Sequence, residues 1–424
     1  MNRTSPQNGL SLIELMIALA ISVLLLLGLV QVFSASRASY MLAQGMARTQ
    51  ENGRFAMEFI QRDARMAGHF GCKSDQSLFL SSMPSLRSLF LSNSADYTTL
   101  PTTTHGQALA FDQSIAGYEA SNTAPGNTME LQAKPAGGGA SDWLPELNPT
   151  LQVPASEAQP VKNSDVLILR FLSPNSATVS AFEPDTTTTP AGFRLRLPVA
   201  EWNALGQNAT QYTATSTPPG LLAIADCRMA LLFQADSVSV DGTNAVINVK
   251  INGLNQSGLD ARDQFDPGMG QIRLYRAESV AYYVGLNPTN SSPTLYRLSF
   301  NTDPGGTAIR RQVDEIAPGV ESLQLLWGRD ASATAGASAK APPSGLVDSY
   351  VTGANVGSTD ARANWQRVGA VKVGLLMRSP DPATSTARAD GVYVLGTKVA
   401  VPNDGRYRFV YETNIALRNR LYGN

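Results

Sequence analysis

An uncharged apolar run near the N-terminus constrains this chain of 424 residues more than any other feature. From Leu15 to Ser36, 22 successive residues carry no charge, and most of them are Leu, Ile, Val, Ala or Met. At about 1.5 Å per residue, a helix of this length crosses the hydrocarbon core of a bilayer. Arg3 precedes the run, so we expect the N-terminus to remain in the cytoplasm. The sequence therefore predicts one membrane-spanning helix, with the rest of the chain beyond the membrane.

The residues before the run distinguish it from an ordinary secretory signal peptide. Such a peptide would place its cleavage site after the apolar run. Here a polar leader ends at Gly9, before the run, and a lone carboxylate, Glu14, lies at the start of the helix. A carboxylate inside a spanning helix is costly, which indicates a function for it. A simple signal anchor would have no use for Glu14.

The segment Gly-Leu-Ser-Leu-Ile-Glu-Leu-Met, from Gly9 to Met16, resembles the class III leader junction of type IV pilins and type II secretion pseudopilins. The resemblance implies that a prepilin peptidase cleaves between Gly9 and Leu10 and methylates the new α-amine of Leu10. The family usually has Phe at this first mature position, where Leu10 keeps a large apolar side chain. Glu14 would then meet the α-amine of a neighbouring subunit, because an unpaired buried charge is expensive.

No proline occurs between Pro6 and Pro84, which permits one helix from about Leu10 to about Met66. We expect Gly45 and Gly53 to weaken this helix locally and to let it bend. Its second half is amphipathic, with an apolar stripe that we expect to contact a globular domain. The stripe consists of Leu42, Met46, Phe55, Phe59, Ile60 and Met66, and the charges expected on other faces are Arg48, Glu51, Arg54, Glu58, Arg62, Asp63 and Arg65.

After Cys72 the pattern changes to short apolar runs that alternate with polar residues and are divided by turn residues, which is typical of antiparallel sheets with one wet face. The fold class is therefore α+β, with a long N-terminal helix packed on antiparallel sheet. The predicted strands are 165–171, 192–197, 231–233, 245–251, 272–276, 279–284, 295–298, 320–327, 368–377 and 407–415.

Several blocks, in order along the chain, resemble the PilW family of minor pilins, which is related to the J-type pseudopilins of type II secretion. They are Gly68 to Cys72, Ile224 to Cys227, Val320 to Gly328, and Arg408 to Asn419. The resemblance implies a non-enzymatic subunit that joins a minor-pilin complex, primes pilus assembly and lies at or near the tip. The implied partners are other minor pilins, the major pilin, the prepilin peptidase and the inner-membrane assembly platform.

With this resemblance, the chain divides into four parts. Residues 1–9 form the leader, 10–36 the transmembrane and pilus-core half of the helix, and 37–71 its amphipathic half. Residues 72–424 form a β-rich periplasmic domain, in which 72–160 has weak periodicity and fits an insertion or a second lobe. The subunit is expected in the inner membrane before assembly and at the cell surface after it.

Two alternatives remain open at this point. One is a pseudopilin of a type II secretion system. Genetic linkage to other pilus genes would distinguish a pilus subunit from such a pseudopilin. The other is a membrane-anchored adhesin or binding module that never polymerises. Such a module would not need its leader junction, so Gly9→Ala would leave its size and function unchanged.

Cys72 and Cys227 are the only cysteines. An even pair in an exported protein predicts one disulfide, whereas in a cytosolic protein two free buried thiols would be the commoner case. Closing a loop of this size contributes about 4–5 kcal/mol in the chain-entropy model.

Asp260, Asp263 and Asp266 form an acidic turn in which carboxylate oxygens are a weak calcium candidate. The spacing does not match an EF-hand, and a solvated hairpin loop is the alternative. We otherwise predict no metal and no cofactor.

Catalytic and nucleic-acid-binding functions find no support in the sequence. It contains no Gly-x-Ser-x-Gly, phosphate-loop or His-Glu-x-x-His motif, and its two histidines, His69 and His105, belong to no recognisable pattern. The formal net charge of −1 provides no basic field to attract nucleic acid.

Overall fold

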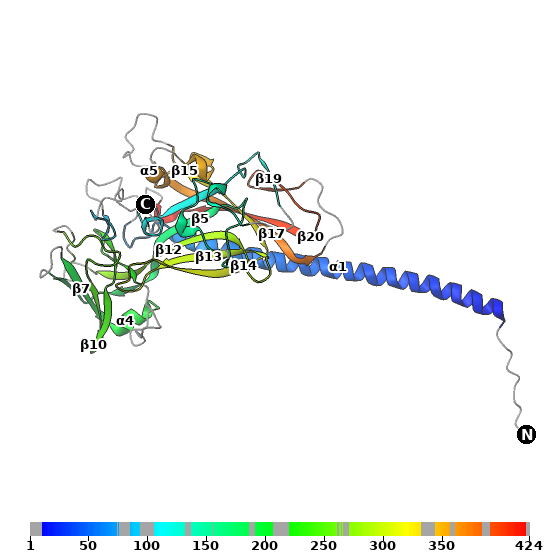
Figure 1. The fold of residues 1–424 in the computed structure, drawn as a ribbon, viewed down its shortest axis with the longest axis horizontal. Coiled ribbons are helices and arrows are strands. Elements are labelled where there is room, and N and C mark those ends of the chain that lie inside the picture. The colour runs from blue at the N-terminus through cyan, green and yellow to red at the C-terminus, as the bar shows by residue number, and fades with distance from the viewer. Residues whose placement is uncertain are drawn as a thin grey trace, which may run out of the picture.

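A long helix and a β-rich domain make up the chain (Figure 1). The structure is a computed structural model, and it describes residues 11–73, 75, 85–93, 106–131, 137–154, 156–185, 191–206, 220–260, 263, 265, 271–331, 344–356, 361–383 and 391–420. The second half of helix α1 (Leu12–Met66) packs on the domain, and its first half extends away from it (Figure 1). The predicted α+β class is confirmed, and the predicted helix bounds agree with those observed to within two residues at its start.

The largest sheet has nine strands arranged around the long strand β12 (Arg273–Leu286). The two runs predicted at 272–276 and 279–284 are this one strand, interrupted by an irregularity between Tyr275 and Ala277. All its described pairings are antiparallel except that of the first two strands in the order. That order is β1 (Leu86–Ser88), β9 (Ala230–Gln234), β8 (Leu221–Ala225), β12, β5 (Val166–Thr178), β2 (Ile115–Ala120) and β4 (Trp143–Leu144), and β13 (Pro293–Asn301) pairs β12 and β14 (Arg310–Pro318).

Three smaller sheets surround this one. The C-terminal sheet has the order β16 (Ser349–Val351), β15 (Val320–Arg329), β17 (Val368–Pro382) and β20 (Arg406–Ala416). A four-stranded sheet at the end of the domain far from the exposed helix has the order β10 (Ser237–Asp241), β11 (Asn244–Val249), β7 (Gly192–Pro198) and β6 (Ala181–Asp185) (Figure 1). The third has the order β18 (Val392–Val394), β19 (Thr397–Ala400) and β3 (Thr128–Glu130).

Short helical segments lie between the strands and after the last one. They are α3 (Gly106–Leu109), η2 (Ala140–Asp142), η3 (Pro149–Leu151), α4 (Val199–Ala204), η4 (Gly353–Asn355), α5 (Ala361–Trp365) and η5 (Arg418–Arg420).

The described strands within residues 72–160 do not form a sheet of their own. Strands β1, β2 and β4 pair within the nine-stranded sheet, and β3 pairs with β19. Pairing partners are set by tertiary packing, which local periodicity does not report. This part of the chain is therefore built into the sheets of the rest of the domain.

Helix α1 meets the domain along a row of small residues. Gly45, Thr49, Gly53 and Ala56 are buried at spacings of three and four, which places them on one helix face. A Cβ atom on Gly53 would lie 2.3 Å from Cε2 of Tyr411 on β20, and the Tyr411 hydroxyl donates a hydrogen bond to the Gln50 carbonyl at 3.1 Å. Gly45 and Gly53 therefore bring the helix close to the C-terminal sheet, a role that the sequence expectation of a local bend did not include.

The predicted apolar stripe is only partly correct. Ile60 is fully buried and Phe59 packs against the main core, but the side chain of Phe55 is 46% exposed. The physical reason is the close approach at the small residues, because a large ring on that face would hold the helix away from β17 and β20. The sheet-facing side of α1 is therefore narrower and smaller in side-chain volume than the stripe suggested.

We expect Gly53→Ala to destabilise the protein by about 1–2 kcal/mol, because the Tyr411 ring leaves no room for a methyl group and overpacking outweighs the gain in helix propensity. Gly28→Ala is the matched control, since no atom lies within 4 Å of a Cβ there. Thermal unfolding of the full chain in detergent would measure both. Equal melting temperatures for the two variants would contradict the close approach.

Candidate assembly site on the N-terminal helix

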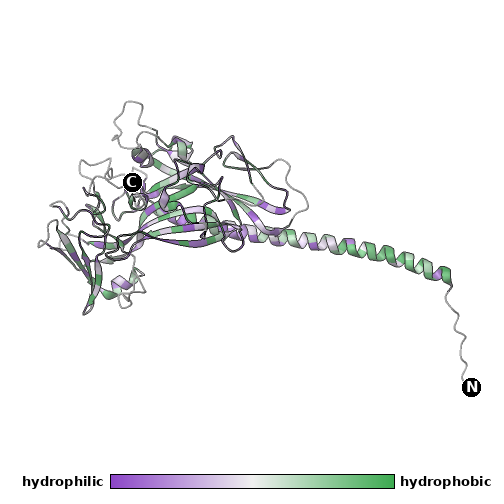
Figure 2. Cartoon of the chain, in the orientation of Figure 1, coloured by the Kyte–Doolittle hydropathy of each residue, from purple (hydrophilic) through white to green (hydrophobic). Residues whose placement is uncertain are grey.

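The first half of α1 has no cover in the protein. Every residue from Ser11 to Tyr40 is exposed, and most of this half is hydrophobic (Figure 2). Among the described residues, α1 is the one helix long and apolar enough to cross a membrane. An exposed surface of this kind requires either lipid or the helices of other molecules.

The start of the helix is capped by its own side chains. The Ser11 hydroxyl accepts a hydrogen bond from the Ile13 backbone N–H at 3.3 Å, and Glu14 Oε2 accepts one from the Ser11 N–H at 3.0 Å. This arrangement is a capping box, and its sequence signal, Ser-x-x-Glu, is present from Ser11 to Glu14. Gly9 and Leu10 lie outside the described residues. The carboxylate of Glu14 is therefore directed at the beginning of the helix.

A buried ion pair fixes the second half of α1 to the large sheet. Asp63 is only 4% exposed, and its Oδ2 accepts hydrogen bonds from the Tyr282 hydroxyl at 2.7 Å and from Arg297 Nε at 2.9 Å. We call Asp63, Tyr282 and Arg297 the helix clamp. Burial raises the pKa of Tyr282, and the charge of Asp63 raises it further, so the phenol stays a hydrogen-bond donor. The clamp ties α1 to β12 and β13.

The expectation that Asp63 faces solvent is wrong. It belongs to a run in which Arg62 and Arg65 are exposed, so the local charge pattern favoured a solvated face. Its position three residues after Ile60 places it on the buried side of the helix, where Arg297 balances its charge. The sequence signal for the burial of Asp63 is its spacing from Ile60, which places both residues on the same face of the helix.

The chain beyond α1 is tied to the domain a second time. Cys72 and Cys227 form a disulfide, as predicted, which joins the segment after the helix to the turn between β8 and β9. His69 lies nearby, with Nδ1 3.1 Å from the Leu172 carbonyl on β5, whereas His105 lies outside the described residues. The helix clamp and the disulfide thus hold the end of α1 from two directions.

The acidic turn proposed for calcium has an arginine partner. Arg87 Nε lies 2.7 Å from Asp263 Oδ1, and Arg87 Nη2 lies 2.5 Å from Asp260 Oδ2, while Asp266 lies outside the described residues. The guanidinium supplies the positive charge that a cation would bring. Across the described ranges, no group of three or more His, Cys, Asp or Glu side chains is placed to hold a metal ion.

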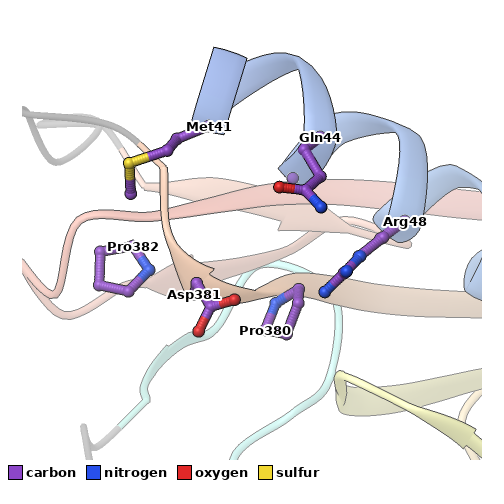
Figure 3. A pocket seen from close by; sticks show the side chains of 7 residues that line it. Met41, Gln44, Arg48, Pro380, Asp381 and Pro382 are labelled. Atoms are coloured by element: carbon purple, nitrogen blue, oxygen red, sulfur yellow. The ribbon is translucent and has the colours of Figure 1, made fainter. Parts of the chain in front are cut away.

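A small pocket marks the place where α1 leaves the domain (Figure 3). It has a volume of about 130 Å³, enough for a few waters or one side chain. Arg48 and Asp381 are its charged residues, and it carries no arrangement of acid, base and nucleophile. The lining residues are Met41, Gln44, Gly45 and Arg48 of α1 with Pro380, Asp381 and Pro382 at the end of β17.

We expect Asp63→Asn to destabilise the chain by about 3 kcal/mol, because the amide leaves the positive charge of Arg297 buried without its counter-ion. Glu58→Gln, a similar change on the exposed face of the same helix, should alter stability by less than about 0.5 kcal/mol. Thermal unfolding of the detergent-solubilised chain compares the two. Equal melting temperatures for Asp63→Asn and Glu58→Gln would show that the helix clamp does not hold the helix.

Two family models match the chain. Residues 281–419 match the model described as PilW, type IV pilus-assembly protein W. Residues 4–30 match the prokaryotic N-terminal methylation motif. The first match begins in β12 and runs beyond β20, and it contains Arg297 of the helix clamp. The second contains Gly9, Leu10 and Glu14. Neither the curated proteins nor the solved structures gave a match.

Proposed function

We propose that this chain, which is a type IV pilus-related, pilin-like protein of the PilW family, acts as a minor subunit of the pilus. The observation that carries the proposal is the exposed apolar half of α1, joined at its other end to a domain by the helix clamp. Lipid covers this half while the subunit waits in the membrane, and the helices of other subunits cover it after assembly. A protein that never polymerised would need only the first of these states.

The proposed processing supplies the charge that Glu14 needs. Cleavage between Gly9 and Leu10 creates an α-amine that is absent from the unprocessed chain. Glu14 Oε2 accepts the Ser11 N–H, which leaves lone pairs on the carboxylate for a stronger donor. In an apolar bundle, the N-methylated amine of an adjoining subunit supplies that donor and neutralises the charge. The pairing then selects one register between the two helices.

The proposed partners and location follow from this role. The N-terminus is cytoplasmic and the β-rich domain is periplasmic before assembly, and the prepilin peptidase and the inner-membrane platform act on this state. Other minor pilins and the major pilin then join the subunit in a priming complex at or near the tip. The presence of Glu14 argues against the outermost position, because no subunit beyond it would offer an α-amine.

Glu14→Ala should deplete the subunit from sheared pili by more than about tenfold while its membrane level and size stay unchanged, because loss of one buried pair costs several kcal/mol. Immunodetection in the pilus and membrane fractions measures this. Glu58→Ala, on the exposed face of the same helix, is the matched control and should leave incorporation intact.

The result that would contradict the proposal is equal incorporation of the Glu14→Ala and wild-type chains. Absence of the wild-type chain from pili, together with loss of type II secretion in a strain without it, would favour the J-type pseudopilin alternative.

A further inference from the structure

Two buried carboxyl groups lie together between the large sheet and the C-terminal sheet. Glu119 is in β2 and is 5% exposed, and Asp165 directly precedes β5 and is 1% exposed. The charge that acts on Asp165 is that of Glu119, so like charges face one another here. The other groups acting on the pair are backbone N–H groups and the hydroxyl of Thr123. Such a pair is expensive unless one member is neutral.

The hydrogen bonds of Asp165 suit an ionised carboxylate. Its Oδ1 accepts the Ala120 N–H at 2.8 Å, and its Oδ2 accepts the Leu325 N–H at 2.8 Å. The first donor follows the Glu119 position in β2, and the second is in β15. One side chain therefore bridges the large sheet and the C-terminal sheet, and both of its oxygens act as acceptors.

The hydrogen bonds around Glu119 suit a protonated carboxyl. Its Oε2 accepts the Gly353 N–H at 3.1 Å, and its Oε1 lies 3.4 Å from the Thr123 hydroxyl oxygen. That hydroxyl has one proton, and its shortest bond, 2.7 Å, is donated to the Ala120 carbonyl. Its oxygen therefore faces the carboxyl groups as an acceptor, and it also lies 3.4 Å from Asp165 Oδ1. A proton on Glu119 would supply the donor for this acceptor oxygen of Thr123.

We propose that Glu119 and Asp165 hold one proton between them and form a pH-sensitive latch between the two sheets. Loss of that proton places two negative charges around one hydroxyl oxygen and weakens the contact of β2 with β15 and η4. The latch belongs to the globular domain and is independent of the proposed pilus function.

The direction of the pH dependence follows from the burial of the pair. Burial raises the pKa of Glu119 from its ordinary value of 4.5 to about 7. Burial also raises the pKa of Asp165, and the charge of Glu119 adds to this effect. For a carboxyl whose pKa is raised by folding, the stabilisation is full below the ordinary value and is lost as pH rises through about 7.

Other titratable groups on the surrounding strands do not offset this change. Tyr118 and Arg170, in β2 and β5, act on each other, and the pKa of Tyr118, raised by burial to about 12, keeps its phenol neutral. From the C-terminal sheet, Gln324 faces the Asn163 carbonyl with an uncharged amide. From β19, the Thr397 hydroxyl donates to the Thr123 carbonyl.

The test is thermal unfolding of the full chain in detergent micelles at several pH values between about 5 and 9. The wild-type melting temperature should fall on the order of 5 °C across this range. Glu119→Gln should remove most of that slope, because its amide donates to Thr123 and its carbonyl accepts the Gly353 N–H. Glu146→Gln, the same change on an exposed residue, should keep the wild-type slope.

A second variant, Asp165→Asn, distinguishes the role of the ionised carboxylate from that of the protonated one. Its amide nitrogen cannot accept an N–H, so this variant should melt below wild type at every pH, unlike Glu119→Gln. A pH slope for Glu119→Gln equal to that of wild type would overturn the proposal.

An independent measurement covers the case in which Glu119→Gln does not fold. The infrared carbonyl band of a protonated carboxyl should persist in the wild-type chain at about pH 6 and disappear by about pH 9, above the range in which exposed carboxyl groups titrate. Absence of this band at about pH 6 would also overturn the proposal.

Discussion

Uncovered apolar surface on one half of a single helix is the constraint on which the rest of the molecule depends. The helix must present the residues from Ser11 to Tyr40 to lipid or to other helices, so nothing in the domain may cover them. Its other half must be packed firmly enough to hold the domain in a fixed place relative to the exposed half. The close contact of Gly53 with β20, the helix clamp and the disulfide together provide that fixation. The exposed first half of α1 is therefore joined to the domain through the packed second half of the same helix.

Charge placement along α1 follows the same division. Glu14 caps the free end of the helix, where a charged partner from another chain is proposed to complete its coordination. Asp63 lies near the opposite end and is neutralised within the chain by Arg297. In this proposal one carboxylate is satisfied between subunits, whereas the other is satisfied within the fold. This asymmetry agrees with a subunit that is stable alone and gains a specific contact on assembly.

Local sequence predicted the features that depend on local order. The length of α1 follows from the absence of proline, the α+β class from alternation, and the disulfide from the number of cysteines and the exported context. Features made by distant segments were not accessible in this way. Glu119 and Asp165 come together because β2 pairs with β5 and both lie against β15. The spacing of the two residues along the chain does not predict this contact. The glycines of α1 suggested flexible points because their contacts, Ser379 and Ala383 for Gly45 and Tyr411 for Gly53, lie far away in the sequence.

Processing and incorporation of the subunit are both tested by the mass and N-terminal residue of the chain recovered from sheared pili. We predict a mature chain that starts at N-methylated Leu10 and is present in the pilus fraction. A chain that still starts at Met1 and is absent from pili would contradict it, and would leave a membrane-anchored domain that does not assemble.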